Sequence, residues 1–258
     1  MKKNRIFLFL FIPFILYILL SSKFLFLVFS EIVVCFSLYE FYKMFKEKNV
    51  YMYFGLFIGA FFPPIVYFKL LPSVFLIASF FITAIIQMLT DYDENFTQKL
   101  ALTFFGIMYI PLLFTYGIKI QHFQFGGLIL TYSFASIWAC DTFAYLIGSK
   151  FGKHKLSKIS PNKSIEGVFG GFIGVLIISY IFKYFVGKIF YDTNVALLSI
   201  FLTIVAVFGD LFESKIKRDV NIKDSGNILA GHGGFMDRFD SALFVIPFIY
   251  FYWRLYVL

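Results

Sequence analysis

The sequence predicts an all-α polytopic membrane protein with about nine transmembrane helices. Of its 258 residues, 60% are hydrophobic and 15% are charged, and the mean hydropathy is +0.83. A soluble domain carries roughly a quarter charged residues. The apolar runs are continuous and have the length of about 20 residues that a helix needs to cross a bilayer. A transmembrane barrel would instead show short segments of alternating polarity.

Apolar runs follow one another along the whole chain. The first comes after the basic start Met1-Lys2-Lys3, and no small-residue cleavage pattern follows it, so we expect an uncleaved helix rather than a signal peptide. Only residues 21–23 separate the first two runs, and a single tilted helix there would reduce the count to eight. The predicted spans are residues 6–20, 24–42, 50–68, 71–90, 100–118, 125–148, 168–186, 195–212 and 241–257.

The positive-inside rule predicts a cytoplasmic N-terminus, because Lys and Arg collect in cytoplasmic loops. The two long charged loops, residues 148–167 and 213–241, then lie on the same cytoplasmic face, and they share a face with eight spans as well. This topology accounts for much of the formal charge of +8, so we expect no nucleic-acid partner. We divide the chain into N-terminal spans (1–124) and a C-terminal catalytic membrane region (125–258).

Residues 209–241 are the densest charged segment of the chain. On a helix, Asp210, Glu213, Ser214 and Lys217 form one polar stripe, because they are spaced i, i+3, i+4 and i+7. Carboxylates gathered on one face repel one another unless a cation joins them, and hard oxygen ligands favour Mg²⁺. The alternative is a set of surface ion pairs. The carboxylates that we predict as metal ligands are Asp210, Asp237, Asp240 and Asp141.

Asp141 lies near the end of the sixth span, with Trp138 and Tyr145 on the same helical face. An ionisable residue in a span is a functional candidate, although an interfacial Asp beside an aromatic belt is the alternative. The loop that follows has five lysines in residues 150–163 and ends in Lys163-Ser164, where a helix N-terminus would expose amide groups to an anion. A basic loop that only contacts anionic headgroups is the alternative here.

Two blocks of this sequence resemble the phosphatidate cytidylyltransferase family, also called CDP-diacylglycerol synthases. The first is Ser214-Lys215-Ile216-Lys217-Arg218, then Lys223-Asp224-Ser225-Gly226, then His232-Gly233-Gly234-Phe235-Met236-Asp237-Arg238-Phe239-Asp240. The second is the run from Trp138 to Gly167, with Asp141-Thr142, Phe151-Gly152-Lys153-His154-Lys155-Leu156 and Lys163-Ser164. Ala230 departs from the family pattern, and the first half of the chain matches only as apolar spans.

The resemblance implies the reaction of CTP with phosphatidate to give CDP-diacylglycerol and pyrophosphate, at a site on the cytoplasmic membrane interface. It implies Mg²⁺, with a second cation left open. We predict catalytic roles for Asp210, Asp237, Lys217, Arg218 and Asp141. We predict that substrate is bound by Lys153, His154, Lys155, Lys163, Ser164, Glu213, Ser214, Lys223, Asp224, His232, Gly233, Gly234 and Arg238.

The expected partners are CTP, phosphatidate and membrane lipids, with a homodimer left open, and the expected location is the bacterial inner membrane. The nearest alternative function is a CTP-dependent kinase for a polyprenol or phytol, which would release CDP rather than pyrophosphate. An ion-coupled transporter is the alternative from another class, but it would place acids near mid-span and show internal repeats. Here the acids gather at span ends.

Overall fold

The computed structural model describes residues 12–46, 50–90, 94–190, 194–226 and 233–256. These residues form helices and connecting turns, with a single isolated bridge between Lys155 and Ser164 as their only extended pairing. The helices are α2 (Lys23–Met44), α3 (Met52–Tyr67), α4 (Pro72–Thr90), α5 (Phe96–Ile107), α6 (Tyr116–Gln121), α7 (Gly126–Phe151), α8 (Ile165–Phe185), α9 (Gly187–Phe190), α10 (Val195–Asp219) and α11 (Asp240–Tyr256).

The predicted fold class is confirmed. Five helical segments in the described part of the chain are long and apolar enough to cross a membrane, namely α2, α4, residues 96–121, α8 and α10. The first two predicted spans are separate helices, because residues 12–20 are helical, the chain bends at Ser21, and the Ser22 hydroxyl accepts a hydrogen bond from Leu25 N–H at 3.2 Å as the N-cap of α2. In the described part of the chain the first two predicted spans are therefore not fused, as the count of nine requires.

Two predicted spans differ from the observed helices. The span at 100–118 is a longer segment broken in the middle by a π-helical turn, Met108–Leu112, which contains Pro111. Proline has no N–H to donate to the preceding turn, so the regular ladder is interrupted there. The span at 195–212 continues as α10 to Asp219, because its polar stripe lets the helix extend beyond the apolar run.

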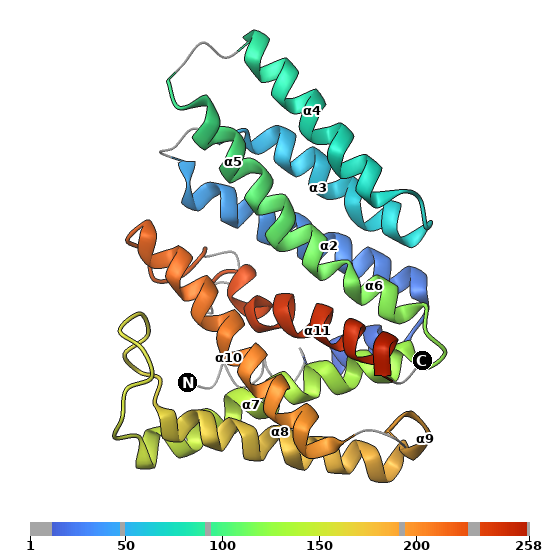
Figure 1. Ribbon diagram of the computed structural model, residues 1–258, viewed down its shortest axis with the longest axis vertical. Coiled ribbons are helices and arrows are strands. Elements are labelled where there is room, and N and C mark those ends of the chain that lie inside the picture. The colour runs from blue at the N-terminus through green and yellow to red at the C-terminus, as the bar shows by residue number, and fades with distance from the viewer. Residues whose placement is uncertain (1–11, 47–49, 91–93, 191–193, 227–232, 257–258) are drawn as a thin grey trace.

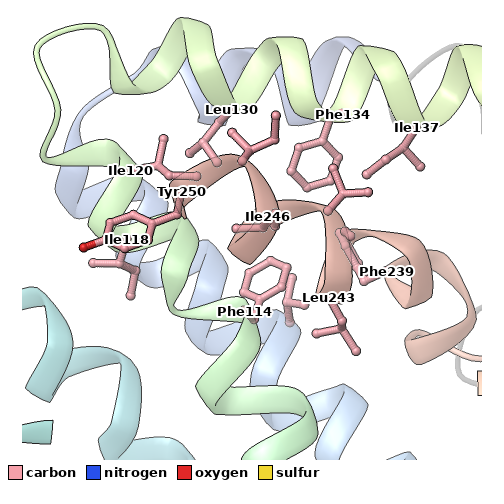
Figure 2. Close-up of a cluster of buried hydrophobic side chains, with 14 of the residues drawn as sticks. Phe114, Ile118, Ile120, Leu130, Phe134, Ile137, Phe239, Leu243, Ile246 and Tyr250 are labelled. Atoms are coloured by element: carbon pink, nitrogen blue, oxygen red, sulfur yellow. The ribbon is translucent and has the colours of Figure 1, made fainter. Parts of the chain in front are cut away.

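Figure 1 shows α2 to α6 grouped on one side of the molecule and α7, α8 and α10 on the other, with α11 between them. The core around α11 is drawn in Figure 2, where Phe239, Leu243 and Ile246 pack against residues of α6 and α7. The loop between α7 and α8 and the C-terminal end of α10 lie on the same side of the molecule in Figure 1. The ion pair of Lys163 with Asp210 shows that the two charged segments are neighbours in space.

Glycines set the close packing of α7 against α8. A methyl group in place of the Gly170 hydrogen would lie 2.7 Å from the Phe143 carbonyl oxygen, and one at Gly174 would lie 2.7 Å from the Ala139 carbonyl oxygen. Only glycine allows the two backbones to approach this closely. This packing brings the start of α8 alongside Ala144 and Gly148 of α7, one to two turns after Asp141.

Candidate functional site

A cavity of about 500 Å³ lies where α7, the start of α8 and α10 meet. Its polar lining includes Asp141 and Tyr145 of α7, Asn162 and Lys163 of the loop, and Asp210 of α10. The ammonium group of Lys163 forms an ion pair with the Asp210 carboxylate. The two charged segments that were singled out in the sequence therefore meet inside one cavity, joined by this pair.

The lysine-rich loop is held in a fixed shape by its own backbone. Leu156 N–H donates to the Lys163 carbonyl at 2.9 Å, and Ile165 N–H donates to the His154 carbonyl at 2.9 Å. Glu166 accepts from His154 N–H and contacts its ring nitrogen Nδ1 at 2.6 Å. Ser164 is the N-cap of α8, since its hydroxyl accepts from Gly167 N–H at 3.0 Å. These bonds fix the point at which Lys163 enters the cavity.

Lys217 is the centre of a second cluster, at the C-terminal end of α10. Its ammonium nitrogen lies 2.6 Å from Asp237 Oδ1 and 3.2 Å from Glu213 Oε2. Asp237 also accepts from Ser225 N–H at 3.1 Å and from Gly234 N–H at 2.7 Å. Burial favours a higher pKa for Asp237, but the Lys217 ammonium and the Gly234 N–H hold this pKa below its usual range. Asp237 is therefore an ionised carboxylate, and each of its two oxygens has a hydrogen-bond or ion-pair partner.

The two clusters are linked along α10. Ser214 donates to Asp210 Oδ1 at 3.3 Å, and Asp210 lies one turn before Glu213. Asp141, Asp210 and Asp240 are close enough to interact electrostatically. Asp240 is brought there by the tight packing of α11 on α10, where a methyl group on Gly209 would lie 3.0 Å from the Asp240 carbonyl oxygen. Four carboxylates therefore lie in the region from the cavity to Lys217, namely Asp141, Asp210, Glu213 and Asp240.

This donor set fits a hard divalent cation in its chemistry, because carboxylate oxygens are the ligands that Mg²⁺ prefers. Glu213 is fully buried, and its Oε1 has no hydrogen-bond partner among the described residues. A nearby cation would satisfy such an oxygen. No three His, Cys, Asp or Glu side chains in the described ranges are placed to hold one ion together. The metal roles of Asp141, Asp210, Asp237 and Asp240 therefore stay predictions.

Several predicted site residues lie away from the cavity lining. Arg218 donates to the Ile222 carbonyl at 2.8 Å and so closes the end of α10. The side chains of Lys153, His154, Lys155, Lys223, Asp224 and Arg238 are exposed. Gly233 and Gly234 come shortly before Asp237 in the sequence, and Gly234 N–H donates to its carboxylate. Gly233 has a positive φ of 79°, which favours glycine. His232 and Ala230 lie outside the described residues. The catalytic role of Arg218 and the substrate-binding roles of the other predicted site residues in this group remain predictions.

Two buried residues near the site come from the N-terminal half, which the sequence motifs do not cover. Glu40 of α2 accepts from Met236 N–H at 2.9 Å and from the Ser225 hydroxyl at 3.2 Å. Tyr109 is buried, and its ring lies near the carboxylates of Glu213, Asp240 and Asp210. An ionisable residue inside a predicted span is a general signal of function, and it could have identified Glu40. The sequence gives no comparable signal for Tyr109.

Comparison with known proteins agrees with the two sequence blocks. The model of a family described as the Cytidylyltransferase family matches residues 2–256. A phosphatidate cytidylyltransferase of Bacillus subtilis is 44% identical over 146 residues, which are 56% of this chain and 54% of that protein. One of Thermotoga maritima is 36% identical over 184 residues, which are 68% of this chain and 67% of that protein.

A phosphatidate cytidylyltransferase of Staphylococcus haemolyticus is 47% identical over 124 residues, or 46% of each chain. The aligned parts thus span from about half to two thirds of the length of these relatives.

Proposed function

This chain belongs to the Cytidylyltransferase family, and from that premise we propose that it transfers CMP from CTP to phosphatidate for phospholipid biosynthesis. The relatives named phosphatidate cytidylyltransferase support this choice of substrates. The observation that carries the proposal is the ion pair of Lys163 with Asp210 inside the cavity. This pair joins Lys163 of the first charged segment, a residue type that binds phosphate, to the Asp210 carboxylate of the second.

In the proposed step, an oxygen of the phosphatidate phosphate attacks the α-phosphorus of CTP. A new P–O bond forms there, and the bond from the α-phosphorus to the oxygen that bridges it to the β-phosphorus breaks. Pyrophosphate leaves with that electron pair, and the product is CDP-diacylglycerol. The lipid supplies the nucleophile, so the protein's task is to align two polyanions and offset their charge.

Lys163 and Lys217 are suited to this task because carboxylates hold their ammonium groups in place. Asp210 fixes Lys163 at the cavity, and Glu213 with Asp237 fixes Lys217 at the end of α10. A cation that is already oriented loses less conformational entropy when phosphate binds. The start of α8, where Ser164 caps the helix, adds exposed amides that favour an anion.

We include Mg²⁺ in the proposal, and Asp210 together with one of its neighbours, Asp141 or Asp240, would hold it. When bound, it would supply positive charge that offsets the negative charge of the phosphate groups. A binding test that needs no substrate is thermal unfolding of the purified protein with increasing MgCl₂. We expect the midpoint to rise for the unaltered protein and to rise less for Asp210→Asn. An equal rise for both would contradict a metal role for Asp210.

The chain is a multi-pass membrane protein, and we propose the bacterial inner membrane with both charged loops in the cytoplasm, where CTP is available. The proposal also keeps a homodimer as an option. Most of the surface of α4 is not covered by the rest of the chain, and that apolar surface can face lipid or a second copy.

The test of the function is an assay of purified protein in mixed micelles with phosphatidate, Mg²⁺ and CTP labelled at either the α- or the γ-phosphorus. We expect the α-label to move into lipid and the γ-label to appear in pyrophosphate. Transfer of the γ-label to a lipid alcohol, with release of CDP, would show the kinase instead. No transfer of either label would refute the proposal.

A further inference from the structure

Resting on the proposed function, we propose that Glu40 of α2 is a positioning residue that holds Asp237 and Lys217 in their catalytic arrangement. The proposal concerns two arms of the chain at the site, residues 223–226 (the first arm) and residues 233–240 (the second arm). Glu40 is 185 residues from Ser225 and 196 residues from Met236 in sequence. Its contacts with the arms therefore depend entirely on the tertiary fold.

One oxygen of Glu40 joins the two arms. Glu40 Oε2 accepts from the Ser225 hydroxyl of the first arm at 3.2 Å and from Met236 N–H of the second arm at 2.9 Å. Ser225 is buried, and its own N–H donates to Asp237 at 3.1 Å. Ser225 is thus held by Glu40 through its side chain and by Asp237 through its backbone. Asp237 in turn holds Lys217.

One glycine on each arm lies directly against the Glu40 carboxylate. A methyl group on Gly226 would lie 2.7 Å from Cδ and 3.0 Å from Cγ of Glu40, with Oε1 as its nearest neighbour. A methyl group on Gly234 would meet the Ser225 hydroxyl oxygen first and would lie 2.6 Å from Glu40 Oε2. Both arms therefore approach Glu40 at distances that only glycine permits. This fit involves one glycine on each arm and each of the two carboxylate oxygens.

The same face of α2 packs on the second arm through aromatic rings. Phe29 lies 6.0 Å from Phe239 and Phe36 lies 5.6 Å from Phe235, between ring centroids. Phe29, Phe36 and Glu40 are spaced i, i+7 and i+11, so they form one stripe along the helix. These ring contacts already pack α2 against the second arm.

A buried carboxylate is not needed for that packing, and burying its charge destabilises the folded state. Glu40 is 1% exposed, and its Oε1 has no hydrogen-bond partner among the described residues. A buried carboxylate with an unsatisfied oxygen destabilises a fold. What Glu40 adds to the rings is a fixed acceptor for Met236 N–H, the residue directly before Asp237. The carboxylate therefore sets the position of Asp237 rather than the stability of the bundle.

The first test compares Glu40→Ala and Glu40→Gln with a matched control, Glu31→Gln. Glu31 lies on the same helix, and its side chain accepts a hydrogen bond from the Cys35 thiol of α2 itself. We expect kcat for CMP transfer to fall by at least about tenfold in Glu40→Ala, the size of one charge-assisted hydrogen bond. We expect a smaller loss in Glu40→Gln, which keeps one acceptor oxygen, and no loss in Glu31→Gln. A wild-type kcat in Glu40→Ala would overturn the proposal.

The second test is a double-mutant cycle that a merely stabilising role would not satisfy. Gly226→Ala should lower kcat in the unaltered protein, because the new methyl group collides with Glu40. In the Glu40→Ala background the same change should have little further effect, because the colliding atoms are gone. If the two losses multiply instead, Glu40 does not shape the arms and the proposal is wrong.

The third test does not use activity. Hydrogen exchange measured by mass spectrometry should show faster exchange of residues 233–239 in Glu40→Ala, with unchanged exchange in α7. Unchanged exchange in 233–239 would overturn the role of Glu40. An unaltered protein that transfers no CMP would refute the proposed function, while exchange and folding still decide whether Glu40 holds the arms. The two failures are therefore distinguishable.

Discussion

The ammonium nitrogen of Lys217 lies 2.6 Å from Asp237 Oδ1, and this ion pair joins α10 to the turn before α11. The side chains are 11% and 13% exposed, so the pair is largely withdrawn from water. Glu213, fully buried, shares the same ammonium. A single lysine thus offsets two carboxylates at the end of one helix.

Replacing Lys217 with Met should remove activity and destabilise the fold. Two buried carboxylates would lose their cation, and breaking such a pair costs about 3 kcal/mol or more. The measurements are CMP transfer and the thermal unfolding midpoint in detergent. Lys215→Met is the control, because the pair of Lys215 with Asp219 is exposed and contributes little. Equal midpoints for the two variants would contradict the buried ion pair.

Asp237→Asn should abolish turnover while the protein still inserts and folds. The amide is nearly the same size as the carboxylate, but it removes the charge that holds Lys217 and accepts Gly234 N–H. The measurement is CMP transfer together with the yield of monodisperse protein in detergent. Full activity of this variant would exclude Asp237 from the catalytic machinery.

Asp237 should also contribute to the pH dependence of stability. Its pKa in the folded protein lies below its ordinary value. Its contribution is therefore complete above the unfolded pKa of about 3.9 and is lost as pH falls through the folded pKa. The unfolding midpoint of the unaltered protein should fall in that acid range, and Asp237→Asn should lose part of this fall. Parallel curves for the two proteins would argue against the shift.

Lys163→Ala should weaken CTP binding, because Lys163 is the lysine that lines the cavity with Asp210. Loss of one charge-assisted contact to phosphate raises KM by about tenfold or more. Lys158→Ala in the same loop is the control, since its side chain is exposed and does not line that cavity. A similar KM for both variants would favour the loop as a general attraction for anions rather than a binding site.

Gly170→Leu should prevent α7 and α8 from packing together, so that the protein no longer folds. The new side chain would begin 2.7 Å from the Phe143 carbonyl oxygen, a backbone atom that cannot move aside without shifting the helix. The readout is the yield of monodisperse protein. Gly187→Ala is the control, because a methyl group there meets nothing within 4 Å.

The sequence predicts the helices well, since the bilayer requires long apolar runs with all backbone groups bonded internally. Its errors lie at helix ends and breaks. Pro111 produces a π-helical turn within an apolar run, and α10 continues to Asp219 past the end of its apolar run. Hydropathy marks where lipid begins and ends, and a helix can continue in water when its polar side chains find partners.

The sequence by itself determined the membrane fold class, the family, and the two charged segments that share one side of the molecule. Local spacing and composition carry that information. Only the tertiary structure decided which distant charges meet: Lys163 with Asp210, Lys217 with Asp237, and Glu40 with the two arms. The physical reason is that these contacts join segments that are distant in the sequence, and the packing of the helices, not a local pattern, brings them together.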